Sequence, residues 1–418
     1  MQRHVGGMLY IAKKMIKNIP VNNVSFNGNE KKYLSECIES GWISHEGPFV
    51  EKFEIQFSKY IGRKYGVAVS SGSAALDIAV IAAGVKKGDE VIMPTFTIIS
   101  PALSIVKAGA IPVLVDSDPD TYNMNIEEIE NKITPKTKAI IAVHIYGLPI
   151  NIDPLLALAK KYHLKVIEDA AQMHGQTYKG KKCGSFGDIS IFSFYANKVI
   201  TTGEGGMILC DDLETTNHCK KLRNLAFEVG GPRFIHQEIG YNSRMTNMQA
   251  ALGVAQLEQI ESFIEKKRAI GKYYNEHLSF LINYGYNLPI PTTGYADNIY
   301  WAYTLVAPDD KQKTHCVEYL NQNKISTREF FTCMHQQPVF NKLNLFPNES
   351  HPVGEQLSAK GFYIPSGIGI TRQELDRVVI NLKNSVFGFL IIALCLSFYK
   401  TIKIMGRAVS QNVPLELI

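Results

Sequence analysis

Five short apolar runs recur through the first half of the chain, separated by segments with the spacing of amphipathic helices. They cover residues 90–93, 111–115, 139–143, 165–167 and 189–192. Continuous apolar strands are typical of a sheet that is buried on both faces, and strands that alternate with helices favour parallel pairing. We therefore expect an α/β fold with a mostly parallel sheet covered by helices on both faces.

A single lysine lies just beyond the last of these runs. The apolar segment 189–194 leads to Lys198, and a glycine-rich stretch, 203–206, follows it. An ammonium group in an apolar pocket loses hydration, so its pKa falls. A lysine that is neutral near pH 7 attacks aldehydes, which is the chemistry that a Schiff-base enzyme needs.

Two upstream motifs offer the other groups that pyridoxal 5′-phosphate (PLP) requires, which are a carboxylate for the ring nitrogen and donors for the phosphate. Asp169 ends a strand, and in an α/β sheet this end faces the crevice where ligands bind. Residues 67–76 predict a strand, a tight turn and a helix start, where backbone N–H groups and the Ser73 hydroxyl would hold a phosphate. Each signal alone is common in other proteins. The order of phosphate turn, acid and lysine is far more specific.

Six motifs carry a resemblance to a known family: residues 41–44, 71–76, 143–147, 168–172, 193–206 and 241–253. With them the chain resembles the PLP-dependent sugar-nucleotide aminotransferases of the DegT family, which have fold type I. The resemblance covers about residues 19 to 384. It implies a large domain with a mostly parallel sheet between helices, and a smaller α+β C-terminal domain. It also implies amino transfer from L-glutamate to C4 of a nucleotide-linked 4-keto-6-deoxy hexose.

The resemblance further implies which residues hold the cofactor. Lys198 would bind PLP as a Schiff base and move protons in both halves of the transamination. Asp169 would pair with the ring nitrogen, and Gln172 would contact the ring 3-hydroxyl. The residues implied for the phosphate are Ser73, Ala74 and Ser193.

A neighbouring subunit and the substrate also enter through the resemblance. The residue that matches Asn242 reaches the cofactor phosphate of the neighbouring subunit, which implies a homodimer with shared active sites. The residues implied for the substrate are Trp42, Ser44, Arg328 and His335. For Trp42, packing in an interface is an equally good interpretation.

The chain departs from the family pattern at two places that face the site. The family often carries an aromatic ring at the Ile98 position, stacked on the cofactor, so either Ile98 or Phe96 is the candidate for that contact. In segment 326–335, the residues at 329, 332 and 333 are not the usual ones. The second departure concerns the substrate rather than the chemistry.

We expect four parts along the chain. They are an N-terminal extension over 1–18, a large PLP-binding domain with its linking helix over 19–275, a small C-terminal domain over 276–384, and a tail over 385–418. The linking helix is predicted over about 245–274 and the final helix over 372–382. The tail holds an uncharged apolar run, 386–399, which is short for a bilayer-spanning helix. Contact with a membrane interface, packing on the body and a non-native end all stay open.

Composition excludes several classes of function. Apolar residues at 45% and charged residues at 20% are typical of a globular protein. The net charge of +5 is not gathered in a long basic block, so we expect no nucleic-acid partner. Seven cysteines are scattered without a Cys-x-x-Cys pair or histidines at metal spacing. We therefore expect no metal, reduced thiols and a cytoplasmic location.

Several alternatives remain open from the sequence. His144 ends a strand and could act as an acid or base, but a structural hydrogen-bonded histidine is the better interpretation. The resemblance favours a GDP-linked sugar, GDP-4-keto-6-deoxy-D-mannose, as the substrate, and a UDP- or dTDP-linked keto sugar is the alternative. A sugar 3-dehydratase of the same fold would carry a histidine in place of Lys198. A non-catalytic regulator of this fold would not need the lysine, and a membrane-tethered scaffold would rest on the tail alone.

Overall fold

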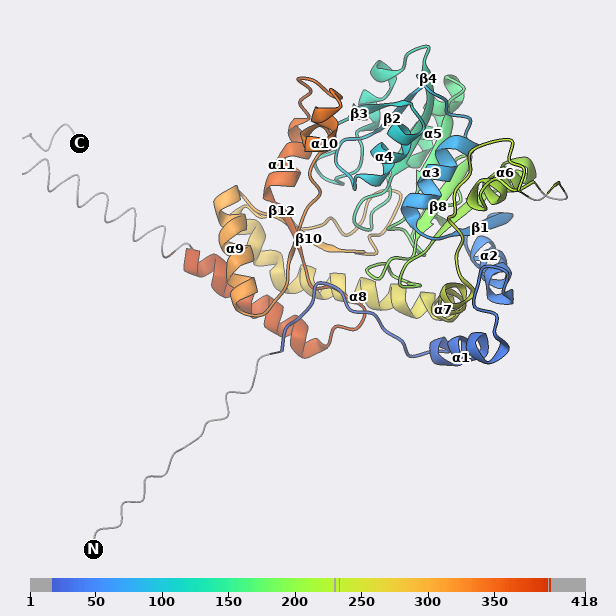
Figure 1. Ribbon diagram of the computed structural model, residues 1–418. Coiled ribbons are helices and arrows are strands. Elements are labelled where there is room, and N and C mark those ends of the chain that lie inside the picture. Colours follow the sequence, from blue (N-terminus) through green and yellow to red (C-terminus); the bar gives the residue numbers. More distant parts are fainter. Residues whose placement is uncertain (1–16, 229–230, 233, 390, 392–418) are drawn as a thin grey trace, which may run out of the picture.

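A seven-stranded sheet forms the centre of the protein. The computed structural model describes residues 17–228, 231–232, 234–389 and 391 (Figure 1). The strand order is β1-β9-β8-β5-β4-β2-β3. The bounds are Tyr65–Val69 for β1, Glu90–Pro94 for β2, Ile111–Val115 for β3, Thr137–Val143 for β4, Lys165–Asp169 for β5, Ile189–Ser193 for β8 and Gly206–Cys210 for β9.

The predicted parallel sheet is confirmed. Strands β3, β2, β4, β5 and β8 pair in parallel, whereas β9 runs antiparallel to both β8 and β1. All five residues of β9 are buried. Because successive side chains of a strand point to opposite faces, both faces of the sheet must be covered there. Strand β9 was not predicted from the sequence, although its apolar run follows directly on the glycine-rich stretch.

Helices pack around this sheet, with α2 against β1, and α3 against β8 and β9. The bounds are Glu30–Ser40 for α1, Pro48–Ile61 for α2, Gly72–Ala82 for α3, Ser100–Lys107 for α4, Ile152–Lys161 for α5, Leu213–Arg223 for α6, Asn247–Leu257 for α7, Ile260–Leu278 for α8, Asp310–Gln322 for α9, Pro338–Lys342 for α10 and Pro352–Lys360 for α11. A last helix covers residues 372–389. A short antiparallel hairpin, β6 (Thr177–Tyr178) and β7 (Lys181–Lys182), lies between β5 and β8 in the sequence.

The predicted linking helix is two helices. A capping box of Thr246 and Gln249 starts α7, which ends at Leu257, and α8 begins at Ile260. The backbone of Gln259 leaves the helical region, with φ −111° and ψ 4°. Its side-chain amide donates to Glu30 of α1 at 3.0 Å. The turn between the helices thus allows a contact with α1 that the helical periodicity of the sequence did not reveal.

A second sheet and a second apolar cluster lie beyond α8. Strand β10 (Tyr303–Val306) pairs with β12 (Gly361–Ile364), which pairs with the short β11 (Arg328–Glu329), all antiparallel. Side chains from α8, from β10 and β12 and from the last helix form the cluster, and Ile19 joins it from the N-terminal side. The division of the chain into domains stays a prediction. The cluster takes residues from both sides of the predicted boundary at 275/276.

The last helix is longer than predicted. It continues past residue 382 to residue 389, and Val386 is buried in the second cluster. The ring of Phe387 lies 5.9 Å from that of Phe280. The start of the predicted tail therefore packs on the body. Residues 390 and 392–418 of the tail, like residues 1–16 of the N-terminal extension, lie outside the described residues. In the part of the chain that the structure describes, no helix is long and apolar enough to cross a membrane.

Candidate active site

A cavity of about 450 Å³ lies where the parallel strands end. The carboxyl ends of β4, β5 and β8 contribute Val143, Asp169 and Ser193 to its wall. This is the position in which open α/β sheets bind their ligands. Of the predicted site residues, the cavity is lined by Ser73, Asp169, Gln172, Ser193, Lys198 and Arg328. A second cavity of about 390 Å³ adjoins it. The two share Tyr195, Asn197, Trp301, Arg328 and Tyr363.

Lys198 presents its amine to the first cavity. The loop that follows β8 positions it, and its backbone N–H donates to the carbonyl of Tyr195 at 2.9 Å. The side chain is half-buried because it opens into the cavity. Loss of hydration lowers the pKa of the amine to about 8, although the nearby Asp169 carboxylate acts in the opposite direction. Near neutral pH a usable fraction of the amine is therefore neutral and nucleophilic.

Asp169 lies at the end of β5, with 3% of its surface exposed. Burial raises the pKa of its carboxyl group, while the Ala171 N–H, at 3.1 Å, and the charge of Lys198 lower it. The described residues form no salt bridge with this carboxylate. A cation that bound in the cavity beside it would stabilise the ionised form.

A hydrogen bond from Tyr146 fixes the orientation of the Gln172 side-chain amide. Its side-chain oxygen accepts a hydrogen bond from the backbone N–H of Tyr146 at 2.6 Å. Because the oxygen is used there, the amide nitrogen is left as a donor. Gln172 lines the cavity, so it offers that donor to an acceptor oxygen of a bound ligand.

The phosphate turn approaches the end of β8 closely. A Cβ at Gly72 would lie 2.7 Å from the Cβ of Ser193, so a larger residue there would push the turn away. The hydroxyls of Ser73 and Ser100 are 2.8 Å apart at the start of α3. Ala74 does not line the cavity, and its N–H donates to the hydroxyl of Ser71 at 3.1 Å. The first N–H groups of the helix and the two hydroxyls can bind an anion here.

Four other predicted residues lie away from this cavity. Trp42 is 51% exposed, and Asn242 is also exposed. The carbonyl of Ser44 accepts the Asn247 N–H at 2.9 Å, next to the start of α7. His335 is buried, with Nδ1 2.8 Å from Thr95 Oγ1 and Nε2 3.1 Å from Glu355. Within one chain, none of these side chains reaches the cavity wall.

The choice between Ile98 and Phe96 is resolved by their positions. Ile98 is 46% exposed and lines the cavity. Phe96 is fully buried and packs against the rings of Tyr146, Phe330 and Phe331. A planar ligand in the cavity would therefore meet the aliphatic side chain of Ile98 and not the ring of Phe96.

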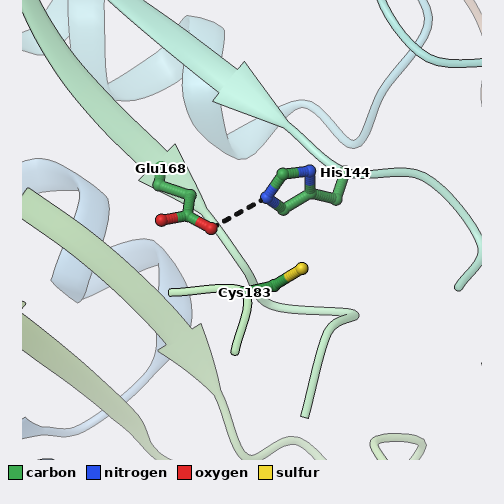
Figure 2. Close-up of side chains that lie close together, drawn as sticks. All are labelled: His144, Glu168 and Cys183. Carbon is green, nitrogen blue, oxygen red and sulfur yellow. Dashed lines mark hydrogen bonds and ion pairs between the residues drawn. The ribbon is translucent and has the colours of Figure 1, made fainter. Parts of the chain in front are cut away.

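His144 lines the cavity and, with Glu168 and Cys183, forms the one group with metal-ligand spacing among the described residues (Figure 2). Nδ1 of His144 accepts the Ile150 N–H at 3.1 Å, so Nε2 carries the proton and donates to Glu168 at 3.0 Å. Both oxygens of Glu168 accept further N–H groups, from residues 184 and 186. Burial raises the pKa of the Cys183 thiol. With its nitrogens and oxygens engaged in hydrogen bonds, the group is best explained as a buried network that fixes the loop after β5.

Comparison with known proteins agrees with this geometry. Residues 25–383 match the DegT/DnrJ/EryC1/StrS aminotransferase family. The chain belongs to this family. It is 39% identical over 360 residues to the GDP-perosamine synthase of Escherichia coli O157:H7, which covers 86% of this chain and 96% of the relative. It is 35% identical over 359 residues to the dTDP-3-amino-3,6-dideoxy-alpha-D-galactopyranose transaminase of Aneurinibacillus thermoaerophilus, covering 85% of this chain and 95% of that one.

A solved structure also superposes on this aminotransferase. The aminotransferase from Psychrobacter cryohalolentis aligns with a TM-score of 0.81 and 29% identity, over 88% of this chain and 99% of the other. The protein is therefore a PLP-dependent sugar aminotransferase with the α/β fold of that class. Its cavity fits the cofactor, because a half-buried amine, a buried carboxylate that forms no salt bridge with the described residues, an amide donor and a helix start with two hydroxyls surround one space.

Several cavity residues were missed by the sequence analysis. The most informative is Trp301, whose ring centroid lies 4.6 Å from the Lys198 amine. Its indole N–H donates to the carbonyl of Asn197 at 3.1 Å. No role in the site was predicted for Trp301, which lies two residues before β10. The signal available in the sequence was that Trp301 is one of two tryptophans, because its burial and its bonded N–H are seen only in the structure.

Proposed function

We propose that this aminotransferase moves the amino group of L-glutamate to C4 of GDP-4-keto-6-deoxy-D-mannose and so forms GDP-perosamine for surface polysaccharide, such as O-antigen. The half-buried amine of Lys198 beside Asp169 carries the chemical part of the proposal. The substrate part is supported by 39% identity with a GDP-perosamine synthase over nearly the whole of that relative.

Four residues that line the cavity have roles in this proposal. PLP would supply an aldehyde for Schiff-base formation and a ring that accepts electrons. Lys198 holds that aldehyde and, once released, carries the proton to and from the carbon that gains or loses nitrogen. A pKa of about 8 suits both tasks near neutral pH. Asp169 keeps the ring nitrogen protonated, and Gln172 donates to the ring oxygen. The Trp301 ring covers Lys198 and excludes water on that side.

One chain supplies Lys198, Asp169 and the phosphate turn, and we propose that a second chain completes the site. Trp42 and Asn242 are exposed and lie away from the cavity of their own chain. Side chains with these positions are available to the cavity of a partner in a homodimer with two shared sites. Ala74 has its N–H bonded to Ser71, so we propose that its part in phosphate binding is smaller than that of Ser73.

The alternative substrate is a dTDP- or UDP-linked keto sugar. The transaminase of Aneurinibacillus thermoaerophilus is 35% identical and carries a dTDP-linked sugar in its name. Residue Glu329, which departs from the usual family pattern, lines the cavity beside Arg328. A side chain at this position contributes to sugar or nucleotide choice. A non-catalytic regulator would have no use for the amine, carboxylate and amide donor around one space.

The substrate is tested with a panel of 4-keto sugar nucleotides. Purified, PLP-loaded protein is incubated with L-glutamate and GDP-, UDP- or dTDP-linked 4-keto-6-deoxy sugars, and aminated products are measured by mass spectrometry. We expect kcat/KM for the GDP-linked mannose derivative to exceed the others by at least tenfold, about 1.4 kcal/mol of transition-state discrimination. A preference for a dTDP- or UDP-linked sugar would contradict the proposed substrate but support the proposed amino transfer. Absence of any amino transfer would contradict the proposal.

A further inference from the structure

A second lysine, outside the cavity, has neutral partners throughout. Lys267 of α8 is 3% exposed. Its Nζ donates to the Trp301 carbonyl oxygen at 2.9 Å, to the Ser366 carbonyl oxygen at 2.6 Å and to the Ser366 hydroxyl at 3.4 Å. Burial alone lowers the pKa of this amine, to about 7. Among the described residues, no carboxylate forms a salt bridge with it.

Such a lysine is a poor choice for stability alone. Burial of an ammonium group without a counter-charge is costly, and apolar residues of similar volume often stabilise a protein more. The three N–H groups of the protonated amine match three oxygen acceptors. The geometry therefore makes Lys267 a clamp between α8 and two segments of chain, at residues 301 and 366.

Both clamped segments form the walls of the two adjoining cavities. Trp301 lines both cavities, and Ser366 lines the smaller one. The Trp301 ring lies over the Lys198 amine at 4.6 Å, and its indole N–H is bonded to Asn197 at 3.1 Å. Lys267 thus fixes the backbone carbonyl of Trp301, and the indole ring of Trp301 lies against the Lys198 amine.

The backbone around Trp301 packs tightly on two sides. A Cβ at Gly271 of α8 would lie 2.1 Å from the ring of Tyr300. A Cβ at Gly147, which has φ +115°, would lie 2.5 Å from the backbone nitrogen of Trp301. Trp301 lies between α8 and the segment at Gly147, and the direction of its carbonyl is set by its hydrogen bond to Lys267. Loss of that donor would leave two buried carbonyl groups without a partner and drive the segment to reorient.

We propose that Lys267 is a positioning residue that holds the Trp301 ring over Lys198 and thereby keeps water from the catalytic amine. This inference rests on the proposed role of Lys198. It assigns to α8 a direct part in shaping the active site. The variant Lys267→Met, which keeps an unbranched side chain one atom shorter but removes charge and donors, is expected to release the ring.

Fluorescence tests the position of the ring without reference to activity. The chain has two tryptophans, so in a Trp42→Phe background the emission reports on Trp301 alone. In the PLP-loaded, full-length protein we expect Lys267→Met to raise the acrylamide quenching constant of Trp301 at least twofold. Lys266→Met is the matched control, because Lys266 is the exposed neighbour on the same helix, and it should leave quenching unchanged.

Single-turnover kinetics separate positioning from substrate binding. With Trp42 intact, Lys267→Met should lower the rate of amino transfer from L-glutamate about tenfold, with the concentration for half-maximal rate changed by less than twofold. Unchanged quenching and rate in a folded Lys267→Met protein would overturn the proposal. Loss of folding in both Lys267→Met and Lys267→Gln would also overturn it, since the residue would then serve stability. If Lys198 were wrongly assigned, the quenching result would still hold while the kinetic effect would be absent.

Discussion

Among the described residues, two lysines with lowered pKa values differ in what surrounds their amines. Lys198 has a pKa of about 8, faces a cavity and has Asp169 nearby, whereas Lys267 has a pKa of about 7 and faces three protein oxygens. Access, and not the pKa, decides which one can bind an aldehyde. The sequence could predict that Lys198 and Asp169 lie at one cavity, because Asp169 ends a recognisable strand and Lys198 follows another. It could not predict Trp301, because its place above Lys198 depends on contacts between segments about a hundred residues apart.

The role of Asp169 is tested by Asp169→Asn. A neutral amide cannot hold a ring proton by charge, so we expect the single-turnover rate with L-glutamate to fall about 100-fold, as is typical when a charge-stabilising group is lost. The exposed Asp153, paired with Lys179, supplies the control variant Asp153→Asn, which should retain the full rate. A full rate in Asp169→Asn itself would remove this carboxylate from the mechanism.

At the scale of the elements, the apolar runs predicted five strands correctly, because strands that are buried on both faces leave a continuous pattern. The sequence pattern did not predict the ends of helices where tertiary contacts determine them. The break between α7 and α8 accompanies the bond from Gln259 to Glu30, and the last helix continues to residue 389 because Val386 packs in the second cluster. Neither partner is close in sequence, so local periodicity carried no signal of either contact.

The last helix leads to a prediction from two truncations. A chain that ends at residue 391 retains Val386 and Phe387, so we expect its kcat and free energy of unfolding to stay close to those of the full chain. A chain that ends at residue 385 loses both side chains, and we expect it to be less stable by about 2–4 kcal/mol. Denaturant unfolding measures the difference. Equal stability of the two truncated chains would show that residues 386–391 add nothing to the second cluster.

At the scale of the whole molecule, one chain supplies the amine, the carboxylate and the phosphate turn, but not every predicted contact. Trp42 and Asn242 lie on the surface, away from their own cavity. From the sequence, a homodimer was implied through the family resemblance alone, since an interface leaves no periodic pattern. The exposed position of these two residues is what a shared site requires.

The dimer prediction has two readouts. Sedimentation should show a homodimer, and dilution below its dissociation constant should release PLP, because each site would lose a phosphate contact. Asn242→Ala should weaken PLP binding about tenfold, the typical loss for one hydrogen bond to a charged group. Asn321→Ala, at an exposed amide of α9, is the control. A monomer that holds PLP at full affinity and turns over at the normal rate would refute the shared site.

The most direct test of the account is to identify the lysine that carries the cofactor. Borohydride reduction fixes PLP covalently to the amine that holds it, and peptide mass spectrometry then locates the modified residue. The account predicts a single modified peptide with the label on Lys198, and its loss in Lys198→Ala. Label on Lys267, the other lysine with a lowered pKa among the described residues, or on no lysine at all, would contradict the assignment of Lys198.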